Sequence, residues 1–381
     1  MKMLGWMLGA VAASALAVGG VIARRLTAPP ARRRFELVIR DVEMEPESVV
    51  VVVDRNRQTI RRGSYALLFE DGGWAQLADD VTDRGPERVE RRVTKLSAGL
   101  RPSVGDRASW SGIYFATPAE AGIEAQKVDL PTPVGIAPAW LLEGTGQNAS
   151  TWAIHIHGMG SPRSGPLRGA RVADELGYTS LVLSYRNDGD GPSVGGRRSM
   201  LGAAEVDDVA AAVHFAVSRG AQRVVLFGWS MGAAIALQLV LDAAISPHID
   251  ALVLESPVLD WVATVKANCV RAGLPAAAGW LAVPWLAFGP LSRAIGLPGP
   301  IPFRVLSWMA HAHELETPTL ILHGTRDDST PLQSARALAE IRPDSVHLEE
   351  FDAGHTMTWN SDPERWERIV SSWLSTRLPK G

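Results

Sequence analysis

The chain has 381 residues, of which 46% are hydrophobic and 21% charged, as is ordinary for a globular protein with a large core. Its 38 basic and 41 acidic residues give a formal net charge of −3, so nucleic acid is excluded as the main partner because no basic excess exists to neutralise phosphates. The single cysteine, Cys269, has no partner for an intrachain disulfide and lies in an apolar helical context, which indicates a buried structural thiol. No cluster with metal-ligand spacing is present, and we expect neither a metal nor a cofactor.

The amino-terminal segment from residue 3 to residue 23 contains no charged residue. An apolar helix of about 20 residues is long enough to cross a bilayer, so we expect a membrane anchor over residues 1–24. The alternative is a secretory signal cleaved after Ala23, but arginines directly after the cut are unfavourable for export. The same arginines slightly favour a cytoplasmic position for the rest of an anchored chain. They are Arg24, Arg25, Arg32, Arg33 and Arg34.

Residues 25–34 form a polar linker that is interrupted by prolines. Residues 35–130 contain several runs of β-branched residues and no convincing helical period, which predicts a small β-rich region. Gly72-Gly73 lies between two of these runs and is typical of a hairpin turn. We find no catalytic constellation in this region, and its role stays open.

From residue 131 to residue 381 short apolar strands alternate with helical patterns, which predicts a mostly parallel sheet flanked by helices. The alternation breaks at about 258–315, a helical stretch rich in Trp, Pro and Gly. We expect this stretch to be a lid inserted above the carboxyl edge of the sheet.

A serine motif stands at one junction of this pattern, in Gly228-Trp229-Ser230-Met231-Gly232. The pentapeptide alone is weak, but here it follows a buried strand and opens a helix, which is the setting of a nucleophile elbow. The turn leaves no room for side chains at its flanks, so Gly228 and Gly232 are expected to be glycine for steric reasons. Ser230 is the expected nucleophile.

A serine hydroxyl needs a base to remove its proton, and the base needs an acceptor that orients it. His355 follows the last predicted strand and is the expected base. Asp327 follows the preceding strand and is the favoured acceptor. Asp328 is adjacent and could replace it, and Asp260 is a rival that fits a helix cap better.

The tetrahedral oxyanion requires hydrogen-bond donors. We expect one to be the N–H of Met231, directly after the nucleophile, and the other to be the N–H of Met159 in the loop after the first central strand. Gly158 would allow that loop to approach the substrate.

These landmarks, in this order along the chain, resemble those of the α/β-hydrolase superfamily between about residues 135 and 378. They are His157-Gly158-Met159-Gly160, Gly228-Trp229-Ser230-Met231-Gly232, His323-Gly324-Thr325-Arg326-Asp327 and Gly354-His355. The amino-terminal segments and the sequence after His355 are similar to membrane-tethered actinobacterial-type hydrolases of the prolyl oligopeptidase and acyl-esterase branches.

The resemblance implies an α/β-hydrolase fold and a serine hydrolase that cleaves ester, thioester or amide bonds through an acyl-enzyme intermediate. A carboxylesterase or lipase acting on a small substrate with an apolar group is favoured, because the expected lid is rich in Trp and Leu. Three alternatives stay open: a peptidase, an acyltransferase, and a membrane-tethered binding protein whose hydrolase core is vestigial.

Overall fold

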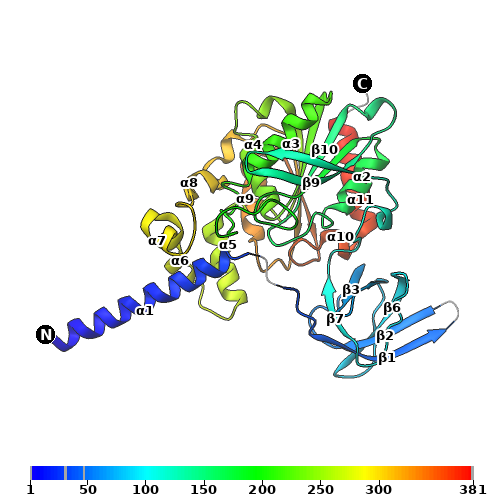
Figure 1. Cartoon of the computed structure of the whole chain (residues 1–381), viewed down its shortest axis with the longest axis horizontal. Helices are drawn as coiled ribbons and strands as arrows, with labels where there is room; N and C mark the ends of the chain where they lie inside the picture. Colours follow the sequence, from blue (N-terminus) through cyan, green and yellow to red (C-terminus); the bar gives the residue numbers. More distant parts are fainter. Residues whose placement is uncertain (1, 30–31, 46–47, 379–381) are drawn as a thin grey trace.

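The computed structural model describes residues 2–29, 32–45 and 48–378. Two sheets form the cores of two domains, as Figure 1 shows. The smaller domain (residues 37–111) contains seven antiparallel strands, and the larger domain (residues 126–378) contains eight strands with helices on both faces. Helix α1 (Lys2–Leu26) precedes both domains.

The smaller domain encloses an apolar core of its own. In β2 (Ser48–Asp54) five consecutive valines include Val51 and Val53, which are fully buried in the domain's own core. β-branched side chains of this kind pack well on a pleated surface. The other strands are β1 (Leu37–Glu45), β3 (Tyr65–Phe69), β4 (Trp74–Leu77), β5 (Thr82–Asp83), β6 (Arg88–Leu96) and β7 (Arg107–Ser111).

The sheet of the larger domain has the strand order β15-β14-β13-β12-β10-β11-β9-β8. The strands from β10 to β15 are parallel, and the antiparallel hairpin β8–β9 forms one edge. Its bounds are β8 (Gln126–Thr132), β9 (Gly135–Leu142), β10 (Thr151–Ile156), β11 (Thr179–Leu183), β12 (Arg223–Trp229), β13 (Ile249–Glu255), β14 (Thr319–Gly324) and β15 (Val346–Phe351).

Helices cover both faces of this sheet and enclose two apolar cores. One core receives buried side chains from α3 (Val206–Ser218), α4 (Met231–Leu239) and α9 (Leu332–Ile341). The other receives them from α2 (Leu167–Glu175) and α11 (Pro363–Arg377). The short α10 (Thr358–Ser361) precedes α11, and 3-10 turns lie at Ala119–Ala121, Gly146–Asn148, Ser246–His248, Trp308–Ala310 and Ala312–Glu314.

A helical insertion separates β13 from β14. It consists of α5 (Trp261–Arg271), α6 (Ala278–Ala287), α7 (Gly289–Ala294) and α8 (Phe303–Leu306). The carboxylate of Asp260 accepts a hydrogen bond from the Ala263 N–H at 3.0 Å and so caps α5. Within residues 258–315, where the sequence predicts a lid, the chain therefore forms several helices, and Trp261, Val265 and Ala282 join the same apolar core as α4 and α9.

The expected membrane anchor over residues 1–24, and with it the membrane localisation, is wrong: among the described residues, no helix combines the length and apolarity that a bilayer crossing requires. The carboxyl half of α1 instead packs on α6, as Figure 1 shows. Ala23 is fully buried in the larger core, and the indole N–H of Trp285 donates to the Leu16 carbonyl at 2.9 Å. At Gly19, an added Cβ would lie 2.0 Å from the Leu281 carbonyl oxygen, so the two helices are in close contact.

Candidate active site

The site lies where the strand order reverses. β10 pairs with β11 on one side and with β12 on the other, so the loops after β10 and β12 leave the sheet beside each other. Crevices at such switch points, at the carboxyl ends of parallel strands, are the usual ligand sites of open α/β sheets. Met159 follows β10 and Ser230 follows β12.

Ser230 has a strained backbone, with φ of 53° and ψ of −112°. A non-glycine residue at positive φ is uncommon and is characteristic of a nucleophile elbow between strand and helix. The flanking glycines are required by space. A Cβ on Gly228 would lie 2.5 Å from the Ala233 Cα, and one on Gly232 would lie 2.2 Å from the Ile156 carbonyl oxygen.

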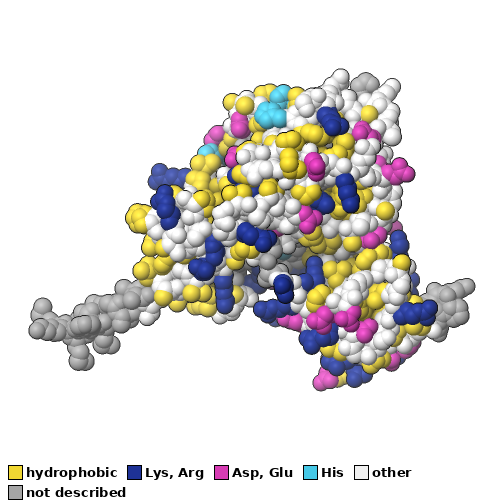
Figure 2. Space-filling view, in the orientation of Figure 1, with side chains coloured by type: hydrophobic (Ala, Val, Ile, Leu, Met, Phe, Trp, Pro, Cys, Tyr) yellow, Lys and Arg dark blue, Asp and Glu magenta, His cyan; other side chains and the backbone are white. Residues whose placement is uncertain are grey.

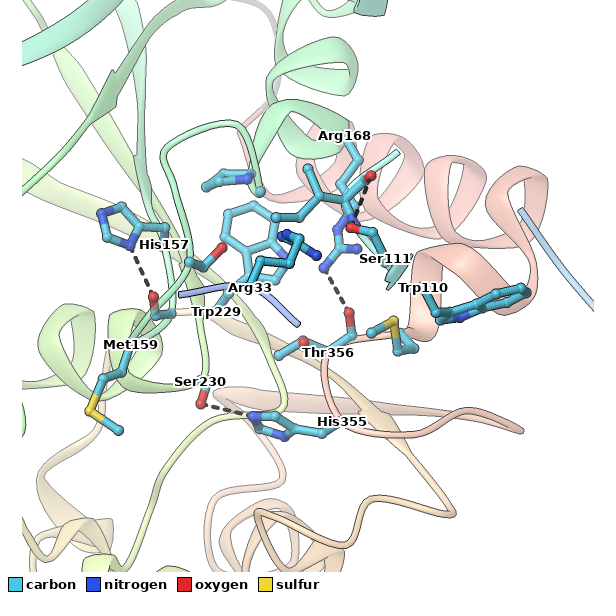
Figure 3. A pocket seen from close by; sticks show the side chains of 17 residues that line it. Arg33, Trp110, Ser111, His157, Met159, Arg168, Trp229, Ser230, His355 and Thr356 are labelled. Carbon is cyan, nitrogen blue, oxygen red and sulfur yellow. Dashed lines mark hydrogen bonds between the residues drawn. The ribbon is translucent and has the colours of Figure 1, made fainter. Parts of the chain in front are cut away.

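A continuous chain of hydrogen bonds joins the three expected catalytic side chains. The Ser230 Oγ lies 2.9 Å from Nε2 of His355, and Nδ1 of the same ring lies 2.8 Å from Oδ2 of Asp327. Figure 3 shows His355 pointing toward Ser230. If Nδ1 carries the proton and donates it to the carboxylate, Nε2 is free to accept the serine proton.

The Asp327 carboxylate is fully buried and is held by several donors. The N–H groups of Ser329 and Thr330 each donate to Oδ1 at 2.9 Å, and the Thr330 hydroxyl donates to Oδ2 at 2.8 Å. Burial by itself would raise the pKa of Asp327, but the hydrogen bonds from His323 and His355 outweigh it and hold that pKa well below its ordinary value. Asp327 is therefore a carboxylate whenever His355 needs an acceptor.

The rival carboxylates lie elsewhere. The Asp328 side chain is 67% exposed and faces Arg271 at 4.0 Å. Asp260 caps α5. The structure thus brings Asp327, and neither rival, to His355.

The loop after β10 lies against the nucleophile. A Cβ on Gly158 would approach the Ser230 Cβ to 3.3 Å, so glycine allows the close approach. Met231 is the first residue of α4, and its N–H is among the amides that a helix leaves without an internal acceptor. Met159 lines the same pocket as Ser230.

Asp188, which the sequence analysis missed, holds this loop in place. Its Oδ2 accepts the Gly160 N–H at 2.6 Å, and its Oδ1 accepts the Gly189 N–H at 2.8 Å. Burial raises the pKa of Asp188 to about 6. Because Asp188 and Gly160 are far apart in the sequence and share no motif, only the folded arrangement identifies this contact.

Two other histidines are buried near the site and support it. Burial lowers the pKa of His155 to about 3 and that of His157 to about 4, so both rings are neutral at pH 7. The His157 ring stacks on Tyr185 at 4.2 Å, and the Tyr185 hydroxyl donates to the His157 carbonyl at 2.9 Å. These contacts fix the backbone that leads into Gly158.

A buried ion pair behind the elbow was also missed. Arg168 lies 3.3 Å from Glu255, and both side chains are almost completely buried. Glu255 accepts from the indole N–H of Trp229 at 2.9 Å and from the Thr358 N–H at 3.0 Å. Arg168 donates to the Thr356 carbonyl at 2.9 Å, next to His355. The pair therefore connects the serine loop with the histidine loop.

The pocket in front of Ser230 has a volume of about 270 Å³. Figure 3 shows it with residues from both domains and from the linker. The end of β7 and the two residues after it contribute the segment from Trp110 to Ile113, and the linker contributes Arg33. The amide of Asn360 joins the domains beside this pocket, because it donates to the carbonyls of Ser64 at 2.6 Å and Gly112 at 2.9 Å.

A second, larger groove of about 710 Å³ shares Met159 with this pocket. Its walls are α1 and α5, and most of its lining is apolar, with Arg25, Asn268 and Arg271 as the polar exceptions. Cys269 lies buried in its wall as a free thiol, and burial raises the pKa of that thiol. Among the described residues, no group of three or more His, Cys, Asp or Glu side chains could hold a metal ion.

Comparison with known proteins gives one match over the larger domain and one over the smaller. The sequence model of the alpha/beta hydrolase family matches residues 141–369, more than half of the chain. A model described as a domain of unknown function (DUF8805) matches residues 38–111. No curated protein matches the chain.

Solved structures also resemble the chain over about two thirds of its length. An esterase from Pyrococcus furiosus aligns at 19% identity with a TM-score of 0.53, over 68% of this chain and 94% of the esterase chain. An alpha-beta hydrolase from Vibrio vulnificus aligns at 20% identity with a TM-score of 0.48, over 65% of this chain and 81% of its own. The predicted α/β-hydrolase fold is confirmed, and the chain belongs to the alpha/beta hydrolase family.

Proposed function

We propose that the protein is a serine hydrolase that cleaves carboxylic esters through an acyl-enzyme intermediate. Ser230 is the nucleophile, His355 the general base and acid, and Asp327 the residue that orients His355. The hydrogen-bond chain from Ser230 Oγ through His355 to Asp327, with distances of 2.9 and 2.8 Å, is the observation that carries the proposal. Such a chain is how a weak hydroxyl nucleophile is activated.

In the first half-reaction the Ser230 proton passes to Nε2 of His355 while Oγ bonds to the ester carbonyl carbon. The carbonyl oxygen becomes an oxyanion that the N–H groups of Met159 and Met231 stabilise, and each such donor typically contributes about 10²–10³ in rate. The bond to the alcohol oxygen then breaks, and the alcohol leaves with the proton from His355. An acyl group remains on Ser230.

In the second half-reaction His355 removes a proton from water, which attacks the acyl carbon. The oxyanion forms again at the same donors. When it collapses, Oγ leaves the carbon and recovers its proton from His355, and the free acid departs. The buried, ionised Asp327 stabilises the imidazolium in both halves without accepting its proton.

The substrate is proposed to carry an apolar acyl group that occupies the groove between α1 and α5. The groove volume of about 710 Å³ falls within the range of about 300–1,000 Å³ that is common for ligand pockets. Met159 lines both the pocket that contains Ser230 and this groove, so the two spaces are adjacent. The helical insertion then serves as the lid that holds the acyl group.

Hydrolysis of para-nitrophenyl butanoate by the full chain tests the proposal. We expect turnover that Ser230→Ala abolishes and that Ser372→Ala, an exposed serine on α11, leaves unchanged. Comparison with a butanoyl anilide separates esterase from amidase activity. Turnover that persists in Ser230→Ala would show that this serine is not the nucleophile.

A further inference from the structure

Arg33 lies in the linker between α1 and β1 and lines the pocket that contains Ser230. Figure 3 shows the Arg33 side chain among those of the pocket, whereas the Met159 side chain points away from Arg33. No hydrogen bond, ion pair or aromatic contact joins the Arg33 guanidinium to any residue that the structure describes. Its neighbour Arg34, by contrast, lies 3.6 Å from Glu36.

The charge of this guanidinium is not balanced within the pocket. Arg33 is exposed to solvent at the edge of the pocket, and an arginine stays protonated in proteins. The other arginine of the lining, Arg168, is neutralised by Glu255 at 3.3 Å. Among the described residues that line the pocket, none is an Asp or a Glu. Of the two arginines in the described lining, Arg33 is therefore the one without an acidic partner.

Further basic side chains lie on the surface around the pocket. Figure 2 shows several Lys and Arg side chains beside the hollow between the two domains. Near His355, the guanidinium of Arg61 lies against the histidine loop, since a Cβ on Gly354 would be 2.6 Å from its terminal nitrogen. Clefts lined by one sign of charge concentrate ligands of the opposite sign.

We propose that Arg33 binds a carboxylate on the alcohol part of the substrate, so that the preferred substrates are esters of an anionic alcohol. The inference rests on the proposed ester hydrolysis. The groove beside Met159 takes the acyl group, which leaves the pocket lined by Arg33 for the leaving group. A guanidinium presents a planar pair of donors that matches a carboxylate, and one positive charge balances one carboxylate. A phosphate dianion would leave one charge unneutralised.

A matched pair of butanoyl esters tests this assignment. One is formed from meta-(hydroxymethyl)benzoate and the other from meta-(hydroxymethyl)benzamide, which have nearly the same shape and differ in charge. We expect the native enzyme to hydrolyse the carboxylate ester with a kcat/KM about twofold to fivefold higher, because an ion pair with an exposed arginine contributes up to about 1 kcal/mol. The preference should lie in KM and should shrink as salt is added.

Arg33→Gln should abolish the preference by weakening only the carboxylate ester, and Arg33→Glu should reverse it. Arg34→Gln, in the same linker, should preserve it. Equal kcat/KM for the two esters in the native enzyme, or an equal loss for both esters in Arg33→Gln, would overturn the inference while ester hydrolysis itself stands. Absence of turnover on both esters, with no reaction of Ser230 with a fluorophosphonate, would overturn the proposed function and the inference together.

Discussion

Arg168 and Glu255 form an ion pair at 3.3 Å whose side chains are 8% and 1% exposed. The two residues lie on α2 and at the end of β13. Glu255 also accepts a hydrogen bond from Trp229 before the nucleophile, and Arg168 also donates to Thr356 after His355. The catalytic loops are therefore held against each other by this buried ion pair.

Removal of one partner of this pair should be costly. We expect Arg168→Met to lower the free energy of unfolding by about 3–5 kcal/mol, because an uncompensated charge remains buried on Glu255. Arg171→Met is the matched control on the same helix. It removes partly exposed contacts with Glu175 at 3.6 Å, with Glu367 at 3.9 Å and with the Phe115 ring, and should cost about 1 kcal/mol. Urea denaturation measures both. Equal losses would show that Arg168 is not a buried structural charge.

The two neighbouring aspartates should behave very differently. Asp327→Asn should reduce kcat by several orders of magnitude, since the amide removes the charge that stabilises the imidazolium and can favour the wrong tautomer. Asp328→Asn should change kcat by less than about twofold, because the Asp328 side chain is exposed and pairs only distantly with Arg271. Steady-state ester hydrolysis by the two variants checks this, and the reverse ranking would reassign the acid.

Asp188 should make stability depend on pH. Burial raises its pKa from 3.8 to about 6, so between these values the folded state holds a proton that the unfolded state has lost. The free energy of unfolding therefore falls as pH rises through this window, by up to about 3 kcal/mol for about two pKa units.

Asp188→Asn should remove this loss, because the amide oxygen still accepts from Gly160 but cannot ionise. The free energy of unfolding of the variant minus that of the native chain should therefore increase as the pH rises from 4 to 7. Urea denaturation curves of both proteins across this range give the difference. A difference that does not change with pH would contradict the raised pKa.

The groove between α1 and α5 should determine acyl-chain preference. With para-nitrophenyl esters from acetate upward, kcat/KM should rise about fourfold per methylene until the groove is filled, since each buried methylene contributes about 0.8 kcal/mol. Ala272→Trp places a bulky ring in the groove and should shorten the preferred chain. Ala287→Trp, exposed on α6 outside this groove, should not. A preference for acetate in the native enzyme would exclude an acyl role for the groove.

The sequence predicted the parts of the site that local patterns encode. Ser230 follows from a strand, a tight turn and a helix, and His355 from its place after the last strand. Asp327 and Asp328 are nearly equivalent in sequence, and only the turn that buries one and exposes the other separates them.

The features of the site that the sequence did not predict depend on contacts between segments far apart in the chain. Asp188 reaches Gly160, and Arg33 reaches the pocket, across parts of the chain that share no motif. The apolar run of α1 suggested a membrane anchor because hydropathy measures how apolar a segment is and not what it packs against. In the structure, Ala23 lies in the core and Trp285 of α6 bonds to Leu16.

Labelling with a fluorophosphonate tests the central claim most directly, because this reagent reacts with an activated serine whatever the natural substrate is. Peptide mapping by mass spectrometry should find one modified residue, Ser230, in the native chain, much slower labelling in His355→Ala, and none in Ser230→Ala. An unlabelled native chain, or labelling that is equally fast in Ser230→Ala, would contradict the assignment of Ser230 as the nucleophile of a serine hydrolase.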